Sequence, residues 1–309
     1  MDAGGFMSDT ELYRELCDIA GDKRVLKNEP MSLHTSFRTG GPADIFVVPK
    51  EAELPEMIGL CVRRGVSYTV IGNGSNLLVG DGGIRGVVFE IGKPMAQIAV
   101  EGTKVRAGAG ALLSAVAAKA LDASLTGFEF ASGIPGSIGG AAVMNAGAYG
   151  GEMKDVLFSV RVLDEKGCAQ EIQAKDLALS YRHSVIPEKN WYVLEALLQF
   201  KTGEKEAIRG RMNELKEQRI AKQPVEYPSA GSTFKRPEGY FAGKLIQDAG
   251  LKGYTVGGAQ VSKKHSGFVI NCGGATSADV RQLIADVQRM VYEDSGVHME
   301  PEVKFLGEF

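Results

Sequence analysis

The stretch ASGIPGSIGGAAVMNAGAYGG, residues 131–151, contains seven glycines in 21 positions and no charged side chain. Glycine loses more backbone entropy on folding than any other residue, so this stretch is a poor candidate for one continuous helix. Some geometric requirement must offset that cost. Either two backbones approach each other closely in a tight loop, or a large, flat and mostly apolar ligand lies against the main chain.

A second glycine-rich stretch, YTVIGNGSNLLVGDGG, follows an apolar strand predicted for residues 68–71. Consecutive backbone N–H groups in such a turn can form a concavity for an anion such as a pyrophosphate, although a plain structural turn is the alternative. A Rossmann fingerprint is excluded, because Leu77 stands at the third glycine position and no helical pattern follows. Leu113 excludes VRAGAGALLS for the same reason. Together the two stretches predict one dinucleotide-like cofactor with a flat ring system, such as FAD.

Bulk properties narrow the class of protein. The chain has 309 residues, 44% of them hydrophobic and 24% charged, with a net charge of −3. This length predicts two or three subdomains, and the charge argues against a nucleic-acid binder. The N-terminus lacks a signal-peptide pattern and no apolar window is long enough to span a membrane, so a cytoplasmic protein is expected. The four cysteines form no CxxC pair, which predicts free thiols and no metal site.

Periodicity predicts three helices, within residues 51–65, 204–222 and 276–296. Gly65 and Gly296 fit left-handed helix ends, and Thr276 with Asp279 resembles a capping box. Short β-type runs lie between the helices without strict alternation, which favours an α+β arrangement. The run AKQPVEYPSAGS, residues 221–232, is the best candidate for a boundary before a last subdomain.

Six motifs then occur in the same order as in the UDP-N-acetylenolpyruvoylglucosamine reductase (MurB) family, which the chain resembles from Thr35 to Leu306. They are IGNGSNLLVGDGGIRGVV, GFEFASGIPGSIGGAAVMNAGAYGGE, YRHS, EYPSAGSTFKRP, AGKLIQDAGLKGYTVGGAQVSKKHSGFVIN and EPEV. The resemblance implies an α+β fold with a two-part FAD-binding domain of the p-cresol methylhydroxylase (PCMH) type and a smaller α+β substrate-binding domain. The expected parts are residues 20–89 with a C-terminal strand at 303–309, residues 90–221, and residues 222–302 for the substrate.

The resemblance also implies an NADPH-dependent, FAD-mediated oxidoreductase acting on a CH–CH group. It would reduce UDP-N-acetylglucosamine enolpyruvate to UDP-N-acetylmuramate, a step in making peptidoglycan precursors. Neither glycine-rich stretch contains a histidine for a covalent link, so FAD is expected to be non-covalent, although His34 lies near in sequence. The expected cofactor-binding residues are Gly72, Asn73, Gly74, Ser75, Asn76, Gly133, Ile134, Pro135, Gly136, Ile138, Gly139, Gly140, Asn145 and Gly147.

Reduction of a vinyl ether that carries a carboxylate needs a group that stabilises charge on the carboxylate and a donor that protonates carbon. By resemblance, Arg182 in YRHS polarises the carboxylate and Ser232 in SAGSTF donates the proton. Glu302 in EPEV lies beside the enolate oxygen, with Glu300 as the alternative.

Further residues align with positions on the substrate side of the family: Tyr149, Arg236, His265 and Lys235. Lys244 and Lys263 lie in the same motifs and could neutralise a diphosphate. The run from YRHS to PSAGS leaves little room for the tyrosine-bearing loop that some members insert, so the chain resembles the shorter type.

Two other functions remain open from the residues. One is a flavin oxidase or dehydrogenase of the same PCMH type acting on a sugar alcohol. The other is a non-catalytic nucleotide-sugar binding protein in which the glycine-rich stretches are only tight loops. SAGSTF together with EPEV favours the reductase, because an oxidase has no use for a serine that protonates a carbanion.

Overall fold

The structure is a computed structural model that describes residues 3–309, with side chains described from Thr10 onward. By its internal contacts the chain divides into two units. The first comprises the residues up to Lys27, Ile45–Asn73 and Gly86–Glu217. The second comprises Asn28–Asp44, Gly74–Arg85 and Gln218–Phe309.

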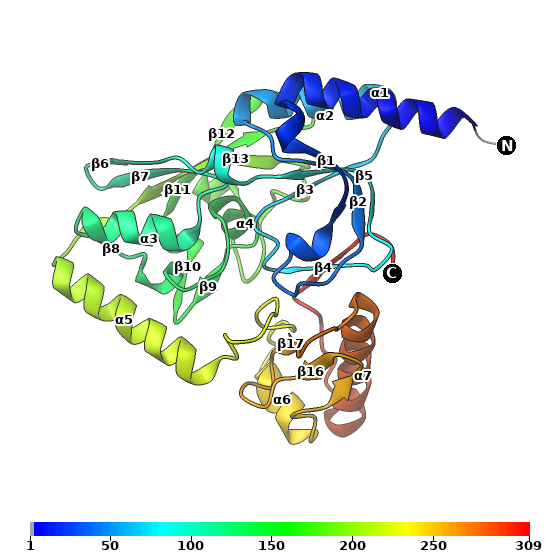
Figure 1. Ribbon diagram of the computed structural model, residues 1–309. Coiled ribbons are helices and arrows are strands. Elements are labelled where there is room, and N and C mark those ends of the chain that lie inside the picture. Colours follow the sequence, from blue (N-terminus) through cyan, green and yellow to red (C-terminus); the bar gives the residue numbers. More distant parts are fainter. Residues whose placement is uncertain (1–2) are drawn as a thin grey trace. The chain divides into compact units, whose positions relative to one another are not determined.

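The first unit opens with two helices, α1 (Ala3–Ala20) and α2 (Leu54–Arg64), which lie side by side in Figure 1. A four-stranded sheet has the order β1-β2-β5-β3, in which β3 and β5 are parallel, and its strands β1, β2 and β5 each contain residues of both units. Its strands are β1 (Val25–Pro30), β2 (Pro42–Val47), β3 (Tyr68–Ile71) and β5 (Ile84–Glu90).

The first unit also contains a five-stranded antiparallel sheet with the order β12-β11-β13-β7-β6. Its strands are β6 (Ile98–Glu101), β7 (Lys104–Gly108), β11 (Leu157–Leu163), β12 (Ala169–Gln173) and β13 (Tyr192–Gln199). The helices are α3 (Leu113–Asp122) and α4 (Ile138–Val143). Two short antiparallel pairs join β8 (Leu125–Thr126) to β14 (Lys201–Thr202) and β9 (Gly147–Ala148) to β10 (Gly151–Glu152).

The second unit contains the sheet β15-β16-β17, against which α7 packs (Figure 1). Its elements are α6 (Ala242–Asp248), β15 (Thr255–Val256), β16 (Ala259–Val261), β17 (Val269–Asn271) and α7 (Ser277–Ser295). A separate parallel pair joins β4 (Leu77–Val79) to β18 (Lys304–Leu306). The chain passes from the first unit to the second within α5 (Lys205–Lys222).

Short 3-10 helices connect many of these elements: η1 (Asp22–Arg24), η2 (Met31–Leu33), η3 (Glu51–Glu53), η4 (Lys93–Met95), η5 (Glu129–Ala131), η6 (Met153–Asp155) and η7 (Ala174–Asp176).

The three helices predicted from periodicity are confirmed as α2, α5 and α7. Gly65 ends α2 with φ 63° and Gly296 ends α7 with φ 71°, both in the left-handed region. The capping box is also present, since Thr276 Oγ1 accepts a hydrogen bond from the Asp279 N–H at 3.0 Å. After Gly74 the chain enters strand β4 rather than a helix, which agrees with the exclusion of a Rossmann fingerprint.

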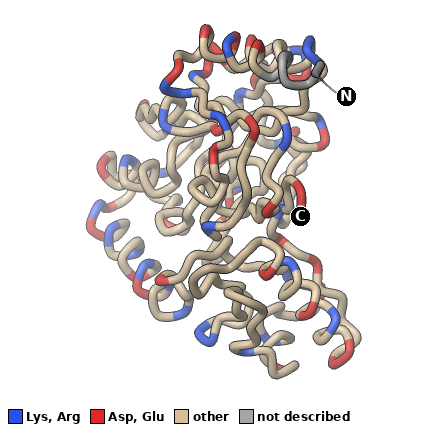
Figure 2. The backbone as a smooth tube through the Cα atoms, turned by 45° about the vertical axis from the view of Figure 1, so that its right-hand side comes forward, with Lys and Arg blue, Asp and Glu red and all other residues tan. Residues whose placement is uncertain are grey.

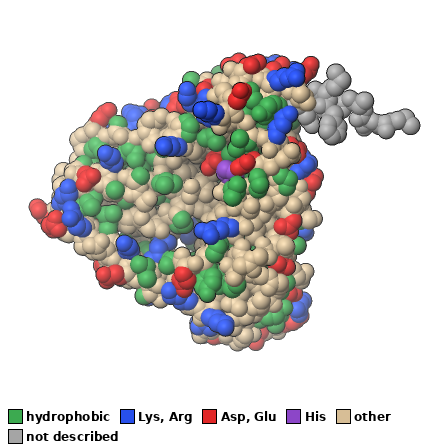
Figure 3. Space-filling model, in the orientation of Figure 1, with side chains coloured by type: hydrophobic (Ala, Val, Ile, Leu, Met, Phe, Trp, Pro, Cys, Tyr) green, Lys and Arg blue, Asp and Glu red, His purple; other side chains and the backbone are tan. Residues whose placement is uncertain are grey.

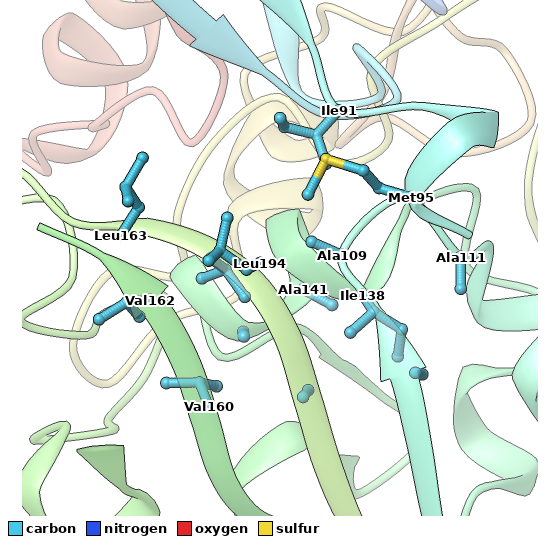
Figure 4. Packing of buried hydrophobic residues seen from close by; sticks show 14 of the residues in the cluster. Ile91, Met95, Ala109, Ala111, Ile138, Ala141, Val160, Val162, Leu163 and Leu194 are labelled. Carbon is cyan, nitrogen blue, oxygen red and sulfur yellow. The ribbon is translucent and has the colours of Figure 1, made fainter. Parts of the chain in front are cut away.

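Each unit has its own hydrophobic core. Figure 4 shows Ile138 and Ala141 of α4 among Met95, Ala109 and Leu194 of the first core. Burial of a side chain such as Ile138 stabilises the fold by about 1.5–3 kcal/mol. The apolar residues of the opening stretch therefore anchor its glycines to the core.

The surface carries mixed charge. Figure 2 shows Lys and Arg interspersed with Asp and Glu along the chain, and the face in Figure 3 mixes the same side chains with hydrophobic ones. Among the described residues no helix is both long and apolar enough to cross a bilayer. The four cysteines are free thiols, as predicted.

Candidate active site

The two glycine-rich stretches meet in the first unit. A Cβ placed on Gly72 would lie 2.8 Å from Ser137 Oγ and 3.9 Å from the Gly140 nitrogen. The Asn73 amide donates a long hydrogen bond of 3.5 Å to the Pro135 carbonyl. Ser137 is buried, and its Oγ has no hydrogen-bond partner among the described residues. Bare backbone and a buried unpartnered hydroxyl therefore lie together at this junction.

The glycines of the opening stretch serve two different purposes. A Cβ on Gly139 would lie 2.9 Å from the Ala109 Cβ, and one on Gly147 would lie 2.5 Å from the Gly151 oxygen. Close approach within the chain accounts for both. Gly140 is exposed, and beyond its chain neighbours and its own helix backbone a Cβ there would meet only Ser137 Oγ, at 3.9 Å. Open space in front of bare backbone is what a ligand lying on main chain requires.

The other candidate cofactor residues of this stretch differ in their exposure to solvent. Gly133 and Pro135 are exposed, Ile134 and Gly136 are half-buried, and Ile138 is fully buried in the core.

The second part of the GNGSN turn belongs to the second unit. Gly74 has φ +60°, and a Cβ there would overlap the His34 carbonyl oxygen. Asn76 is fixed to the chain beside Glu302, because its amide donates to the Glu302 carbonyl at 3.1 Å. Ser75 is half-buried between them. The His34 ring lies 2.9 Å from a Glu29 carboxylate oxygen.

Arg182 is at the tip of a tight turn in the first unit. Ser180 and His183 exchange backbone hydrogen bonds of 3.2 Å, which leaves only two residues at the tip. Arg182 has φ 54°, a conformation that costs a non-glycine residue about 1–2 kcal/mol. Its Nη2 donates to the Gly147 carbonyl at 3.3 Å. The structure thus brings Arg182 to the end of the glycine-rich stretch.

Asn145 ties the same two loops together. Its side-chain amide donates to Glu152 Oε2 at 2.5 Å and to the Ser180 carbonyl at 2.9 Å, and its Oδ1 accepts from the Lys154 N–H at 2.8 Å. The residue is fully buried. The Asn145 side chain therefore acts within the protein to hold the loop that carries Arg182.

Backbone strain gathers at this point. Asn145 and Tyr149 have φ 44° and 54°, in the same left-handed region as Arg182. Such conformations persist only where the surrounding structure imposes them, and they are concentrated at functional sites. A hydrogen bond from the Lys154 ammonium is the main cause that lowers the pKa of Glu152, with smaller effects from Asn145 and Arg182. Glu152 therefore stays ionised as the acceptor of this network.

Ser232 lies in a loop of the second unit. Gly231, with φ +75°, precedes it, and Ser232 itself is half-buried. On one side the Thr233 N–H donates to the Gly267 carbonyl at 2.9 Å, and on the other the Glu302 N–H donates to the Thr233 carbonyl at 2.8 Å. Ser232 and Glu302 are therefore brought together by backbone pairing.

The two candidate glutamates of EPEV differ in environment. Glu302 is buried, whereas the side chain of Glu300 is exposed and forms an ion pair with Lys235. Burial strengthens electrostatic interactions, so Glu302 has the better setting for chemistry.

His265 is half-buried and its Nδ1 accepts a hydrogen bond from the Gly267 N–H at 3.1 Å. A ring nitrogen that accepts is unprotonated, so Nε2 carries the proton of the neutral ring. Burial is the main cause that lowers the pKa of His265 below its ordinary value of 6.5, with a smaller contribution from Lys252. His265 therefore presents a neutral N–H donor.

Arg236 and its neighbours form a second exposed group in this unit. The Arg236 guanidinium stacks over the Phe241 ring, 3.8 Å from its centre, and Arg236 Nε donates to the Tyr240 carbonyl at 3.2 Å. Lys244 pairs with Asp248 at 2.7 Å and Lys263 is exposed.

Sequence reasoning missed two residues that the structure singles out. Ser137 stands within GIPGSIGG, and only its buried hydroxyl distinguishes it from its neighbours. Nothing in the sequence around Phe241 marks it as functional, since an aromatic residue beside a tyrosine and two residues before a glycine is common in folded chains.

Two family models and curated relatives match this chain, and together they cover most of its length. Residues 223–306 match the UDP-N-acetylenolpyruvoylglucosamine reductase C-terminal domain family, and residues 42–173 match an FAD-binding domain family. The chain is 56% identical over 297 residues to the UDP-N-acetylenolpyruvoylglucosamine reductase of Agathobacter rectalis, covering 92% of this chain and 95% of that one. It is 54% identical over 302 residues to that of Lachnoclostridium phytofermentans, covering 96% and 97%.

A solved structure is also similar. The crystal structure of UDP-N-acetylenolpyruvylglucosamine reductase (MurB) from Thermus caldophilus matches with a TM-score of 0.79 and 35% sequence identity, covering 92% of this chain and 98% of that one.

Proposed function

Because the chain belongs to the UDP-N-acetylenolpyruvoylglucosamine reductase family, we propose that it reduces UDP-N-acetylglucosamine enolpyruvate to UDP-N-acetylmuramate with NADPH as the reductant. The fold is α+β, with a PCMH-type FAD-binding domain and a smaller substrate-binding domain. The observation that carries the proposal is identity above one half over nearly the whole length of both chains. The sugar-alcohol oxidase is less well supported.

The residues at the Gly72–Ser137 junction fit FAD. Gly140 offers exposed bare backbone and Ser137 offers a buried hydroxyl without a partner among the described residues. Bound FAD supplies a carrier that accepts a hydride from NADPH and passes it on. We assign its binding to the residues predicted from the sequence, with backbone rather than side-chain contacts at Asn145. Non-covalent binding is part of this proposal.

Arg182 would stabilise the carboxylate of the enolpyruvyl group. Its planar guanidinium matches a carboxylate, and the strained turn fixes where the side chain begins. The network at Asn145 and Glu152 keeps that turn in place, so little reorganisation is needed when charge develops.

Ser232 would deliver a proton to carbon while Glu302 lies beside the enolate oxygen. A serine hydroxyl is a weak acid, but an enolate is a strong base, and a positioned donor contributes about 10²–10⁴-fold to rate. Backbone pairing through Thr233 fixes Ser232 relative to Glu302.

The remaining parts of the proposal concern the substrate and the organisation of the chain. Tyr149, Arg236, His265 and Lys235 would contact the nucleotide sugar. Residues 20–89 with 303–309 and residues 90–221 would form the two FAD-binding parts, and residues 222–302 the substrate domain. We also propose that the enzyme works in the cytoplasm, where its nucleotide substrate would be made.

Anaerobic half-reactions test the assignment. In Ser232→Ala and Glu302→Gln, flavin reduction by NADPH should stay near the wild-type rate, whereas reoxidation by the enolpyruvyl nucleotide should slow by about 10²–10⁴-fold. Glu300→Gln is the matched control and should change neither rate by much. Equal loss in both half-reactions would remove the two residues from these roles. Wild-type flavin that is reoxidised by air but not by the enolpyruvyl nucleotide would support the oxidase instead.

A further inference from the structure

Phe241 is among the most exposed large hydrophobic side chains that the structure describes. It is 61% exposed and the neighbouring Tyr240 is 48% exposed. The Arg236 guanidinium covers one face of the Phe241 ring at 3.8 Å. An aromatic ring fixed at the surface by an arginine presents a flat apolar area at little cost in conformational entropy.

Contacts within the second unit connect the segment of Phe241 to the segment of Ser232. The Thr233 N–H bonds to the Gly267 carbonyl at 2.9 Å. A Cβ on Gly243 would lie 3.4 Å from both the Gly267 nitrogen and the His265 Cε1 atom. Phe241 is two residues before Gly243 in the chain. The buried backbone of Thr233 and Gly267 therefore links the segment that carries Ser232 to the segment that carries Phe241.

The charges on these two segments suit a diphosphate. Arg236 and Lys235 follow Ser232, Lys244 follows Phe241, and the Nε2–H of His265 is a further donor. Glu300 and Asp248 pair with the two lysines and so temper their charge. A nucleotide sugar whose reacting end lies at Ser232 would place its diphosphate over these groups and its base beyond them.

From this arrangement we propose that Phe241, held by Arg236, binds the uracil ring of the substrate by stacking. The proposal rests on the proposed function, which supplies a uridine nucleotide as substrate. It adds the residue that recognises the base, which is distinct from the residues assigned to the chemistry.

Calorimetric titration of the FAD-loaded enzyme with UDP tests the proposal. Phe241→Ala should weaken UDP binding by about 10-fold or more, because loss of a base–aromatic stack typically has an effect of that size. Phe241→Tyr keeps the ring and should bind UDP within about 2-fold of wild type. The thermal midpoint and the FAD content should match wild type in both variants, which checks that they fold.

Phe158 provides a matched control, because it is 41% exposed and Lys104 lies 4.5 Å from its ring centre in the first unit. Phe158→Ala should bind UDP like wild type. Wild-type affinity for UDP in Phe241→Ala would overturn the proposal. So would a change in the oligomeric state of Phe241→Ala with UDP binding intact, since that would make the ring a protein interface.

Failure of the proposed function gives a different pattern. In that case the wild-type enzyme would not turn over the enolpyruvyl nucleotide, whatever Phe241→Ala does to UDP binding. An active wild-type enzyme whose UDP affinity is insensitive to Phe241→Ala would refute the stacking proposal alone.

Discussion

Replacing Gly140 by alanine should separate the stability of the fold from its affinity for FAD. Gly140 lies in α4, and apart from its chain neighbours and its own helix backbone no atom lies nearer than 3.9 Å to its Cβ position. Alanine in a helix is favoured over glycine by about 0.5–1 kcal/mol, so the flavin-free protein should become more stable by about that amount. The added methyl would occupy the space assigned to the cofactor. Overpacking costs about 1–3 kcal/mol, which corresponds to FAD binding about 5- to 150-fold weaker.

Gly139→Ala is the matched control on the preceding residue, and its effect on stability should have the opposite sign. Its Cβ would lie 2.9 Å from the Ala109 Cβ and 3.2 Å from the Ala109 oxygen. The free energy of unfolding should fall by about 1–3 kcal/mol, since the site is buried and has no room. Adding Ala109→Gly removes the nearer atom and should restore part of the loss.

Urea denaturation without FAD measures the first effect, and quenching of flavin fluorescence on titration with FAD measures the second. Gly140→Ala should raise the urea denaturation midpoint and at the same time lower the affinity for FAD. A Gly140→Ala variant that binds FAD as tightly as wild type would refute the idea that bare backbone at this position serves the cofactor.

Three further outcomes are expected. Asn145→Leu should lower the free energy of unfolding by about 3 kcal/mol, because it removes three hydrogen bonds made by a fully buried side chain. Asn73→Ala on the surface should change it by less than about 0.5 kcal/mol, and similar urea midpoints for the two variants would contradict the network. Thr276→Ala should cost about 1 kcal/mol through loss of the α7 cap, and an unchanged thermal midpoint would argue against the capping box. Burial lowers the pKa of His265, so the unfolded chain binds a proton there more readily than the folded chain, and stability should fall as pH drops below about 6.5. In His265→Gln the urea midpoint should therefore depend less on pH between about pH 5 and 7.5. A pH dependence equal to that of wild type would count against a role for His265.

Prediction from the sequence worked best where the deciding interactions are local. The start of α7 needs only Thr276 and Asp279, three residues apart, and its end needs only Gly296. The same holds for α2 and Gly65. Capping and left-handed termination act within one turn of chain, so a short window of sequence contains the required information.

Candidate site residues were harder to interpret, because their environments depend on distant chain. Glu300 and Glu302 are the same residue type and only two positions apart. Glu300 is nevertheless exposed and paired with Lys235, whereas Glu302 is buried. Asn145 gave no sign of its contact with Ser180, 35 residues away. Only tertiary packing distinguishes such residues.

The sequence by itself determined that an uncharged, glycine-rich backbone would be built at residues 131–151 and beside Gly72, because backbone freedom belongs to the residue type. Only the tertiary structure decided which glycine has which purpose. At Gly139 the backbone and side chain of Ala109, in the same unit, leave no room for a Cβ, whereas at Gly140, the next residue in the chain, a Cβ would fit. The physical reason is that excluded volume around a Cβ position is set by atoms brought there by folding, and these come from residues far along the chain.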